Sequence, residues 1–228
     1  MHLVLVQGRA TAARNEVPAL VDATGMFGQN SVISGLRYFF TPGIRAQIER
    51  EVRAQLEKFV RTGLILSHVD GHLNIHMHPT VLGMLLELAP AYGIRALRLP
   101  REPLAISLRL DRRAWLRKLV EAVTFRGLLA YARPRVAARG LRYPDQMFGL
   151  HQSGHVIEPY VLGVLAALPA GVTEIYCHAA VVDAEARRWR PADYESAAEL
   201  AAMTSPRVRA ALAAGHIQRI SYRDLGST

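Results

Sequence analysis

Short apolar runs alternate with longer amphipathic runs along the whole chain. The short runs have the length and composition of β-strands, and the longer ones repeat apolar residues with helical spacing. The candidate strands are residues 2–7, 64–68, 94–99, 146–150, 172–178 and 217–222. The candidate helices are residues 42–62, 79–92, 111–139, 158–168 and 191–214. Such alternation predicts an α/β fold with a mainly parallel sheet, open or closed.

Proline, serine and glycine mark several of the expected helix ends. Pro79 and Pro206 suit the first turn of a helix, and Ser205 is a good N-cap before the second of them. Glycines follow three helical runs, as helix stops do. They are Gly93, Gly140 and Gly215.

The chain has 228 residues, enough to bury a full core, and the simplest organisation is one domain over residues 1–228. Residues 8–41 form a long connection with little regular pattern, and such a length is typical of a functional loop. The first strand begins directly after Met1, as if an earlier part of the fold were absent.

Composition restricts the class of protein. Half of the residues are hydrophobic, which argues against intrinsic disorder. The longest uncharged apolar stretch, residues 159–173, is too short and too interrupted to span a bilayer. One cysteine, Cys177, allows no internal disulfide and fits a reducing compartment. We therefore expect a cytoplasmic protein.

The formal net charge is +9, and the basic residues are denser between Arg109 and Arg142. Trp115, Phe125 and Tyr131 lie among them. A solvated helix face, an anionic membrane surface and nucleic acid could each explain this pattern. The solvated helix face is favoured, since no nucleic-acid motif accompanies the charge. Of the other two explanations, a peripheral membrane contact is the better.

Metal-binding residue types are concentrated in one tract. His68, Asp70, His72, His76 and His78 occupy alternate positions, and Asn74 fills the one that remains. This period of two predicts an extended strand with one polar face. The tract is either a metal site, since imidazole is the commonest protein ligand, or a solvent-facing edge strand. We favour the metal site, because ordinary polar residues would serve an edge strand equally well.

Other histidines are weaker candidates when taken alone. His178 ends the apolar run 172–178, where ligands gather in α/β folds, and it is a candidate ligand or general acid. Cys177 has the opposite phase and is expected in the core. His151 and His155 lie four apart among glycines, so a polar loop is favoured over a helical ligand pair. By position, His2 begins a strand and is a poor candidate.

Four motifs carry a resemblance to a known family. Residues 67–79, Ser-His-Val-Asp-Gly-His-Leu-Asn-Ile-His-Met-His-Pro, resemble the His-rich motif of the YdjC/ChbG-like carbohydrate deacetylases. Residues 174–178 resemble that family's late Cys-His-Pro motif, and residues 221–224 its Ser-Tyr-Arg-Asp motif. His2-Leu-Val-Leu resembles the strand that carries a metal-ligating histidine. Within the family, residues 3–9 and 17–22 are most similar to the hopanoid-biosynthesis branch, HpnK.

The resemblance implies a TIM-barrel-like (β/α)7 fold and a divalent metal ion of the zinc or magnesium class. It gives His2 and His72 as metal ligands and His178 as the acid that protonates the leaving amine. Residues that would contact substrate or support the ligands are His68, Asp70, His76 and Arg223. The implied substrate is an N-acetylated amino sugar, carried on a hopanoid lipid in the HpnK branch. A membrane-associated location and a homodimer accompany this interpretation.

The chain also departs from the family pattern. Nothing in it matches the family's opening strand, which ends in Asn-Ala-Asp-Asp-Phe and supplies the carboxylate ligand and the base. Asn74 replaces a family histidine, and Ala179 replaces the proline after Cys-His. Six strands are expected here against seven in the family barrel, so we expect an N-terminally incomplete and impaired enzyme. The alternatives are a shortened, non-catalytic binding protein of the same fold and, less favoured, a nucleic-acid binder.

Overall fold

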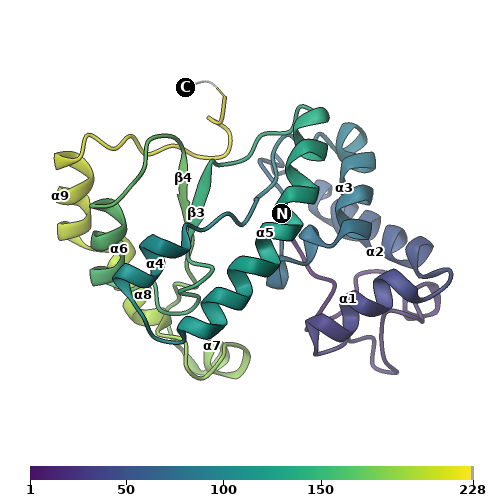
Figure 1. Cartoon of the computed structure of the whole chain (residues 1–228). Coiled ribbons are helices and arrows are strands. Elements are labelled where there is room, and N and C mark those ends of the chain that lie inside the picture. The colour runs from purple at the N-terminus through teal and green to yellow at the C-terminus, as the bar shows by residue number, and fades with distance from the viewer. Residues whose placement is uncertain (227–228) are drawn as a thin grey trace. The chain divides into compact units, whose positions relative to one another are not determined.

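A computed structural model describes residues 1–226, and their contacts divide the chain into two compact units (Figure 1). Unit 1 comprises Met1–Leu99, Leu128–Tyr143 and Tyr222–Thr228. Unit 2 comprises Pro100–Gly127 and Pro144–Ser221. Each unit is described by itself below. The single domain expected from the sequence stays a prediction.

Unit 1 is built around short parallel backbone pairs. Strand β1 (His2–Leu3) pairs with β2 (Asp70–Gly71), with His2 opposite Asp70. Single parallel bridges join Val69 to Leu97 and Ala96 to Arg142. These pairs satisfy buried backbone groups, and they bring four distant stretches of sequence together. The first strand and the start of the His-rich tract therefore lie side by side.

Four helices belong wholly or partly to unit 1. They are α1 (Ser31–Phe40), α2 (Ile44–Val60), α3 (Pro79–Tyr92) and the C-terminal part of α5 (Trp115–Ala138). The bounds of α3 are those that the sequence predicts, with Pro79 in the first turn and Gly93 at φ +65° after the last. Helix α2 buries Ile48, Val52 and Leu56 at helical spacing, so one apolar face holds it in the core.

The connection 8–41 is more regular than expected. It contains a short 3-10 helix, η1 (Arg14–Glu16), two isolated antiparallel bridges and helix α1. The side chain of Asn30 caps α1 by accepting from the backbone N–H groups of Val32 and Ile33. The prediction of a long loop is therefore wrong over residues 31–40, because the Asn30 cap starts a helix there.

The His-rich tract departs from the predicted extended strand. Pairing ends at Gly71, and residues His72–Met77 form a 3-10 segment, η2. Leu73 and Asn74 have positive φ values of 49° and 55°, which turns the chain at this point. The turn sends the histidines in different directions, so alternation of polar residues here does not mark one face of a strand.

Unit 2 has its own parallel pair and its own core. Strand β3 (Gln146–Phe148) pairs with β4 (Thr173–Ile175), within two of the predicted runs. The helices of unit 2 are α4 (Leu104–Leu110), the N-terminal part of α5, α6 (Glu158–Leu165), α7 (Ala184–Trp189), α8 (Ser196–Thr204) and α9 (Pro206–Ala214). Phe148, Val161 and Val164 lie at the centre of the core. The predicted helix 191–214 is divided at Ser205, which caps α9 as expected.

The mixed α/β class is confirmed, and part of the strand prediction is wrong. Over the described residues, the runs 64–68 and 217–222 form no strand, and 94–99 contributes only single bridges. The four described strands form two small parallel sheets of two strands each, and the (β/α)7 barrel stays a prediction. Among the described residues, every helix is too short or too polar to cross a bilayer.

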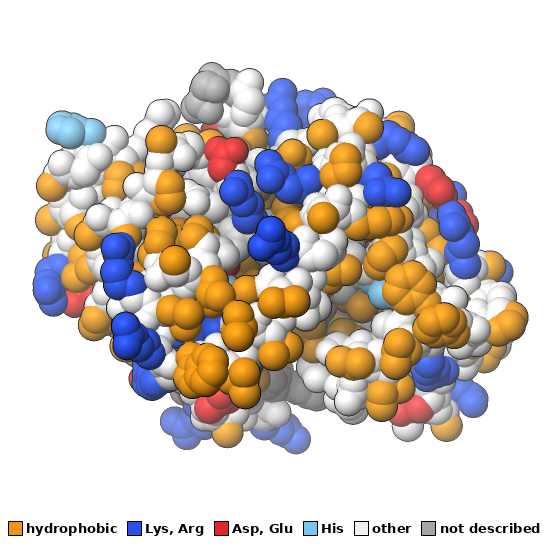
Figure 2. Space-filling view, in the orientation of Figure 1, with side chains coloured by type: hydrophobic (Ala, Val, Ile, Leu, Met, Phe, Trp, Pro, Cys, Tyr) orange, Lys and Arg blue, Asp and Glu red, His pale blue; other side chains and the backbone are white. Residues whose placement is uncertain are grey.

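Large apolar side chains remain exposed on some helices. On the first part of α5, Trp115 is 58% exposed and Val123 65% exposed. Figure 2 shows hydrophobic side chains gathered over this part of α5, with Lys and Arg side chains near them.

Candidate active site

The two histidines implied as metal ligands lie together in unit 1. The ring centroids of His2 and His72 are 5.9 Å apart, with an edge-on angle of 75°. The β1–β2 register explains this, because His2 pairs with Asp70 and His72 follows two residues later. Zinc–nitrogen bonds of about 2.1 Å allow two rings on one ion to be up to roughly 6 Å apart. The pair is therefore close enough to share an ion.

A buried carboxylate orients the first of these rings. Asp70 is 7% exposed, and its Oδ1 lies 3.0 Å from His2 Nδ1. Its Oδ2 accepts from the guanidinium of Arg98. Burial alone would raise the pKa of Asp70, but the hydrogen bond from His2 and the charge of Arg98 hold that pKa well below its usual value. An ionised Asp70 accepts from Nδ1 and so directs Nε2 of His2 toward a ligand role.

Gln7 orients the second ring. Its amide nitrogen donates to the carbonyl of Gln29 at 2.8 Å, which fixes the amide so that Oε1 lies 3.3 Å from His72 Nε2. Because an amide oxygen only accepts, Nε2 of His72 carries the proton, and Nδ1 is the nitrogen suited to a metal. Gln7 has a φ of +52°, a conformation that is unusual for a residue with a side chain.

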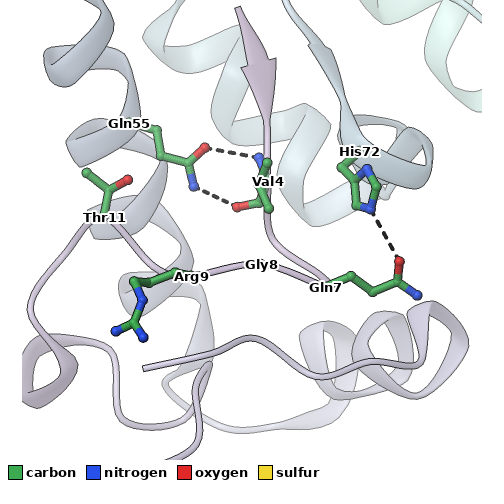
Figure 3. Close-up of a pocket in the computed structure, with 7 residues that line it drawn as sticks. All are labelled: Val4, Gln7, Gly8, Arg9, Thr11, Gln55 and His72. Atoms are coloured by element: carbon green, nitrogen blue, oxygen red, sulfur yellow. Dashed lines mark hydrogen bonds between the residues drawn. The ribbon is translucent and has the colours of Figure 1, made fainter. Parts of the chain in front are cut away.

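A pocket of about 280 Å³ lies beside His72 (Figure 3). Gln55 closes one side by bonding both the N–H and the carbonyl of Val4, at 3.0 and 2.6 Å. Gln7 lies on the His72 side of the view and Arg9 lies between Gly8 and Thr11. Seven residues line the pocket: Val4, Gln7, Gly8, Arg9, Thr11, Gln55 and His72. Its lining is mixed, and the polar side chains of Arg9 and Thr11 could bind hydroxyl groups.

The remaining tract histidines point into the protein or contact aromatic rings. His76 is fully buried, and its Nε2 lies 2.8 Å from the carbonyl of Arg98, the residue that also binds Asp70. Burial lowers the pKa of His76 to about 4. His78 bonds the carbonyl of Gly35, and His68 stacks on Tyr222 at 3.7 Å. These contacts support the site's framework.

His178 lies in unit 2, just beyond β4. Its backbone N–H donates to the buried carboxylate of Glu199 at 2.7 Å, and Glu199 also accepts from the N–H of Val156 at 2.8 Å. The rings of Tyr176 and Tyr194 lie 5.7 and 4.9 Å from the imidazole. Glu199 thus joins the segments that follow β3 and β4, and it fixes the backbone at His178.

The other expectations have mixed outcomes. His151 and His155 lie in a loop, as predicted, and their Nδ1 atoms contact Glu121 and Glu195 at 3.0 and 2.8 Å. Cys177 is half-buried against the unit 2 core, where burial raises the pKa of its thiol. Arg223 is exposed on a turn.

The donor set for a metal is incomplete within the described residues. No group of three His, Cys, Asp or Glu side chains there is arranged to hold an ion. His2 and His72 fit two positions of a catalytic site, which usually has three protein ligands and an open position.

Sequence reasoning missed Gln7, Gln55 and Arg98. Only the glutamine-glycine pair at the end of the first strand could have pointed to a turn at Gln7. Asp70 and Arg98 are 28 positions apart, and Gln55 and Val4 are 51 apart, so no local pattern signals their contacts.

Comparison with known proteins decides the family. The model for the family described as YdjC-like protein matches residues 1–214. The chain belongs to the YdjC-like family. Relatives of this YdjC-like chain include proteins named carbohydrate deacetylase. The one from Geobacillus stearothermophilus is 28% identical over 98% of this chain and 74% of its own length. The one from Mus musculus is 31% identical over the whole chain and 77% of its own length.

A third relative of the YdjC-like chain matches only in part. The carbohydrate deacetylase of Brevibacillus brevis is 41% identical, but over 41% of this chain and 35% of that protein. Among solved structures, one from Enterococcus faecalis V583, described as a cellobiose-phosphate cleavage protein, is similar with a TM-score of 0.71. It covers 98% of this chain and 76% of its own, and at 22% identity it supports the fold alone.

Proposed function

We propose that this YdjC-like chain is a carbohydrate deacetylase that hydrolyses the acetamide of an N-acetylated amino sugar. The observation that carries the proposal is the pair of oriented imidazoles, His2 and His72, with His72 lining a pocket. The deacetylase names of relatives that align with the whole chain support the reaction class.

His2 and His72 would hold a divalent ion of the zinc or magnesium class. When bound, such an ion polarises an amide carbonyl and lowers the pKa of a bound water. Asp70 and Gln7 keep the two rings in the required tautomers. Arg98 and His76 support Asp70, one by its charge and the other through the Arg98 carbonyl.

The pocket would bind the sugar. Arg9 and Thr11 offer guanidinium and hydroxyl groups, which are suited to sugar hydroxyls. His68 and Arg223 would contact substrate farther out. His178 would donate a proton to the departing nitrogen, because an unprotonated amine anion is too basic to leave. Loss of such an acid typically lowers the rate by about 10² to 10⁴.

Finer details of the proposal follow from the sequence resemblance. The substrate would be a sugar-bearing hopanoid lipid, as in the HpnK branch, and the protein would contact the membrane peripherally and form a homodimer. The fold would be the (β/α)7 barrel that the resemblance implies. Similarity of residues 3–9 and 17–22 to the HpnK branch supports this placement.

The alternative is a binding protein of the same fold that does not hydrolyse its ligand. The incomplete ligand set within the described residues favours it. Such a protein would bind an N-acetylated amino sugar in the pocket and release no acetate.

One experiment tests the proposal and separates it from the alternative. Acetate release from N-acetylglucosamine oligosaccharides is measured with zinc or magnesium added, alongside calorimetric sugar binding. The deacetylase predicts acetate release that His72→Ala abolishes and His178→Ala lowers at least about 100-fold. Sugar binding without acetate release would support the alternative. If the protein neither binds the sugar nor releases acetate, both the proposal and the alternative are contradicted.

A further inference from the structure

The first part of α5 in unit 2 has an apolar surface on the outside of the protein. Its exposed side chains are called the α5 stripe here. They are Trp115, Leu116, Leu119, Val120 and Val123, exposed by 58, 58, 40, 59 and 65%. Their spacing places them on one side of the helix over more than two turns.

The one buried side chain on this part of the helix is charged. Lys118 is 1% exposed, and its ammonium group donates to the carbonyl of Asp111 at 2.7 Å and to Gln152 Oε1 at 3.0 Å. This part of α5 therefore has the reverse of the usual polarity, with a lysine inside and a tryptophan outside. An arrangement that exposes so much apolar area indicates that something apolar covers it.

Arginines lie next to the α5 stripe. Five of them are exposed: Arg109, Arg112, Arg113, Arg117 and Arg126. The two acidic residues in the same span pair with two of these arginines, which leaves the span with a net positive charge. Asp111 accepts from Arg113 and Gln152, and Glu121 contacts Arg117 and His151. The surface around the α5 stripe is thus positively charged, and Figure 2 shows Lys and Arg side chains near the hydrophobic ones.

We propose that the α5 stripe inserts into the surface of an anionic phospholipid bilayer. A helix lying in the interface buries an apolar face, while flanking arginines reach the phosphates and tryptophan occupies the headgroup level. A second copy of the chain is a poorer partner, because it would bring two arginine-rich surfaces together. Five side chains are also few for a stable dimer, which buries about 800 Å² on each partner.

Helix α1 also exposes apolar side chains, including Phe39 and Phe40, but Arg37 is its single charged residue. Charge therefore distinguishes the α5 stripe from α1. This inference extends the peripheral membrane contact of the proposed function. Its own support is the exposure of the apolar side chains of the α5 stripe and the positive charge around them. Vesicle binding needs no catalysis, so its failure would leave the deacetylase proposal intact.

The test uses tryptophan fluorescence. The sequence has two tryptophans, so Trp189→Phe leaves Trp115 as the only reporter. Vesicles of phosphatidylcholine alone are compared with vesicles that also contain phosphatidylglycerol. We expect a blue shift of Trp115 emission with the anionic vesicles, and binding at least about 10-fold tighter than to neutral ones. Added salt should weaken that binding.

Paired variants identify the surface. In the Trp189→Phe background, Val120→Ser with Val123→Ser removes two exposed methyl-rich groups and should weaken vesicle binding at least about 10-fold. The control, Leu64→Ser with Ile65→Ser, changes two side chains exposed by 65 and 70% in unit 1 and should bind like the parent. Circular dichroism confirms that both variants fold.

Three results would overturn the proposal. The first is an unshifted Trp115 spectrum with anionic vesicles. The second is equal loss of binding in the control pair. The third is a blue shift that grows with protein concentration in the absence of vesicles, since that would show a second copy covering the stripe.

Discussion

Two hydrogen bonds decide which nitrogens of the histidine pair face a metal. Asp70 binds Nδ1 of His2, and Gln7 binds Nε2 of His72. The two rings therefore present different nitrogens, and neither choice follows from the sequence. These contacts make the orienting residues as testable as the ligands themselves.

Replacing Asp70 by Asn should lower zinc affinity about 10- to 100-fold, because the amide holds Nδ1 of His2 less firmly. Calorimetric titration measures this. The control is Arg98→Gln. It removes the ion pair between Arg98 and Asp70 and leaves the contact between Asp70 and His2 in place. Equal zinc affinity in Asp70→Asn and the parent would show that the carboxylate does not orient the ligand.

Replacing Gln7 by Gly should separate metal affinity from stability. Glycine suits the φ of +52°, so the free energy of unfolding should change by less than about 1 kcal/mol. Zinc affinity should fall about 10-fold, because His72 loses its acceptor. Gln7→Glu restores an acceptor and should recover most of the affinity. A Gln7→Gly variant with unchanged zinc binding would exclude this role.

At this scale the sequence predicted residue identities better than contacts. The family resemblance predicts His2 and His72 as ligands of one ion; their ring centroids lie 5.9 Å apart, and the ligand role stays a prediction. Arg98 was unpredictable, because its contact with Asp70 depends on the parallel bridge between Val69 and Leu97. His76 looked like its neighbours in sequence and is instead buried, since the backbone turns at Leu73.

The η2 segment should make the protein sensitive to mild acid. His76 has a pKa of about 4 when folded and about 6.5 when unfolded, so between these values the unfolded chain binds more protons. Stability should therefore fall by about 3 kcal/mol as pH drops from about 7 to about 4, and the His76 contribution should be flat below that. Burial shifts His78 in the same direction.

Urea unfolding across that pH range measures the effect, and His76→Gln serves as the comparison because it does not titrate. The variant should show a clearly smaller loss between pH 7 and pH 4. Identical slopes for the variant and the parent would contradict a neutral, buried His76.

Helix α8 should stabilise the strand ends of unit 2 through Glu199. Removing its carboxylate in Glu199→Ala leaves the N–H groups of Val156 and His178 without their acceptor, so the free energy of unfolding should fall by about 2–4 kcal/mol. The control is Glu185→Ala on α7, an exposed site where a change within about 0.5 kcal/mol is expected. Urea unfolding compares the two, and equal effects would show that Glu199 has no special role.

Helices were more predictable than strands. Helix α3 is long and periodic with proline and glycine at its ends, so its bounds follow from local sequence. The run 64–68 is apolar enough for a strand, but pairing begins only at Val69, where partners from distant sequence are available. The residues at which a strand begins and ends depend on which segments are available to pair with it. An apolar run of sequence does not by itself show where those segments lie.

For the whole molecule, the family match over residues 1–214 and the oriented histidine pair support one account. The sequence predicted the mixed α/β class through its alternating runs. It did not predict the division into two compact units, because that depends on contacts between residues far apart in the chain.

The central claim is that His2 and His72 bind the same divalent ion. Nitrogen NMR of the histidine rings during zinc titration tests it most directly. We predict that signals of Nε2 in His2 and Nδ1 in His72 move together, and that His2→Ala greatly reduces the change at His72. An unmoved His72 in the parent, or an equal change at His72 in His2→Ala, would contradict the account.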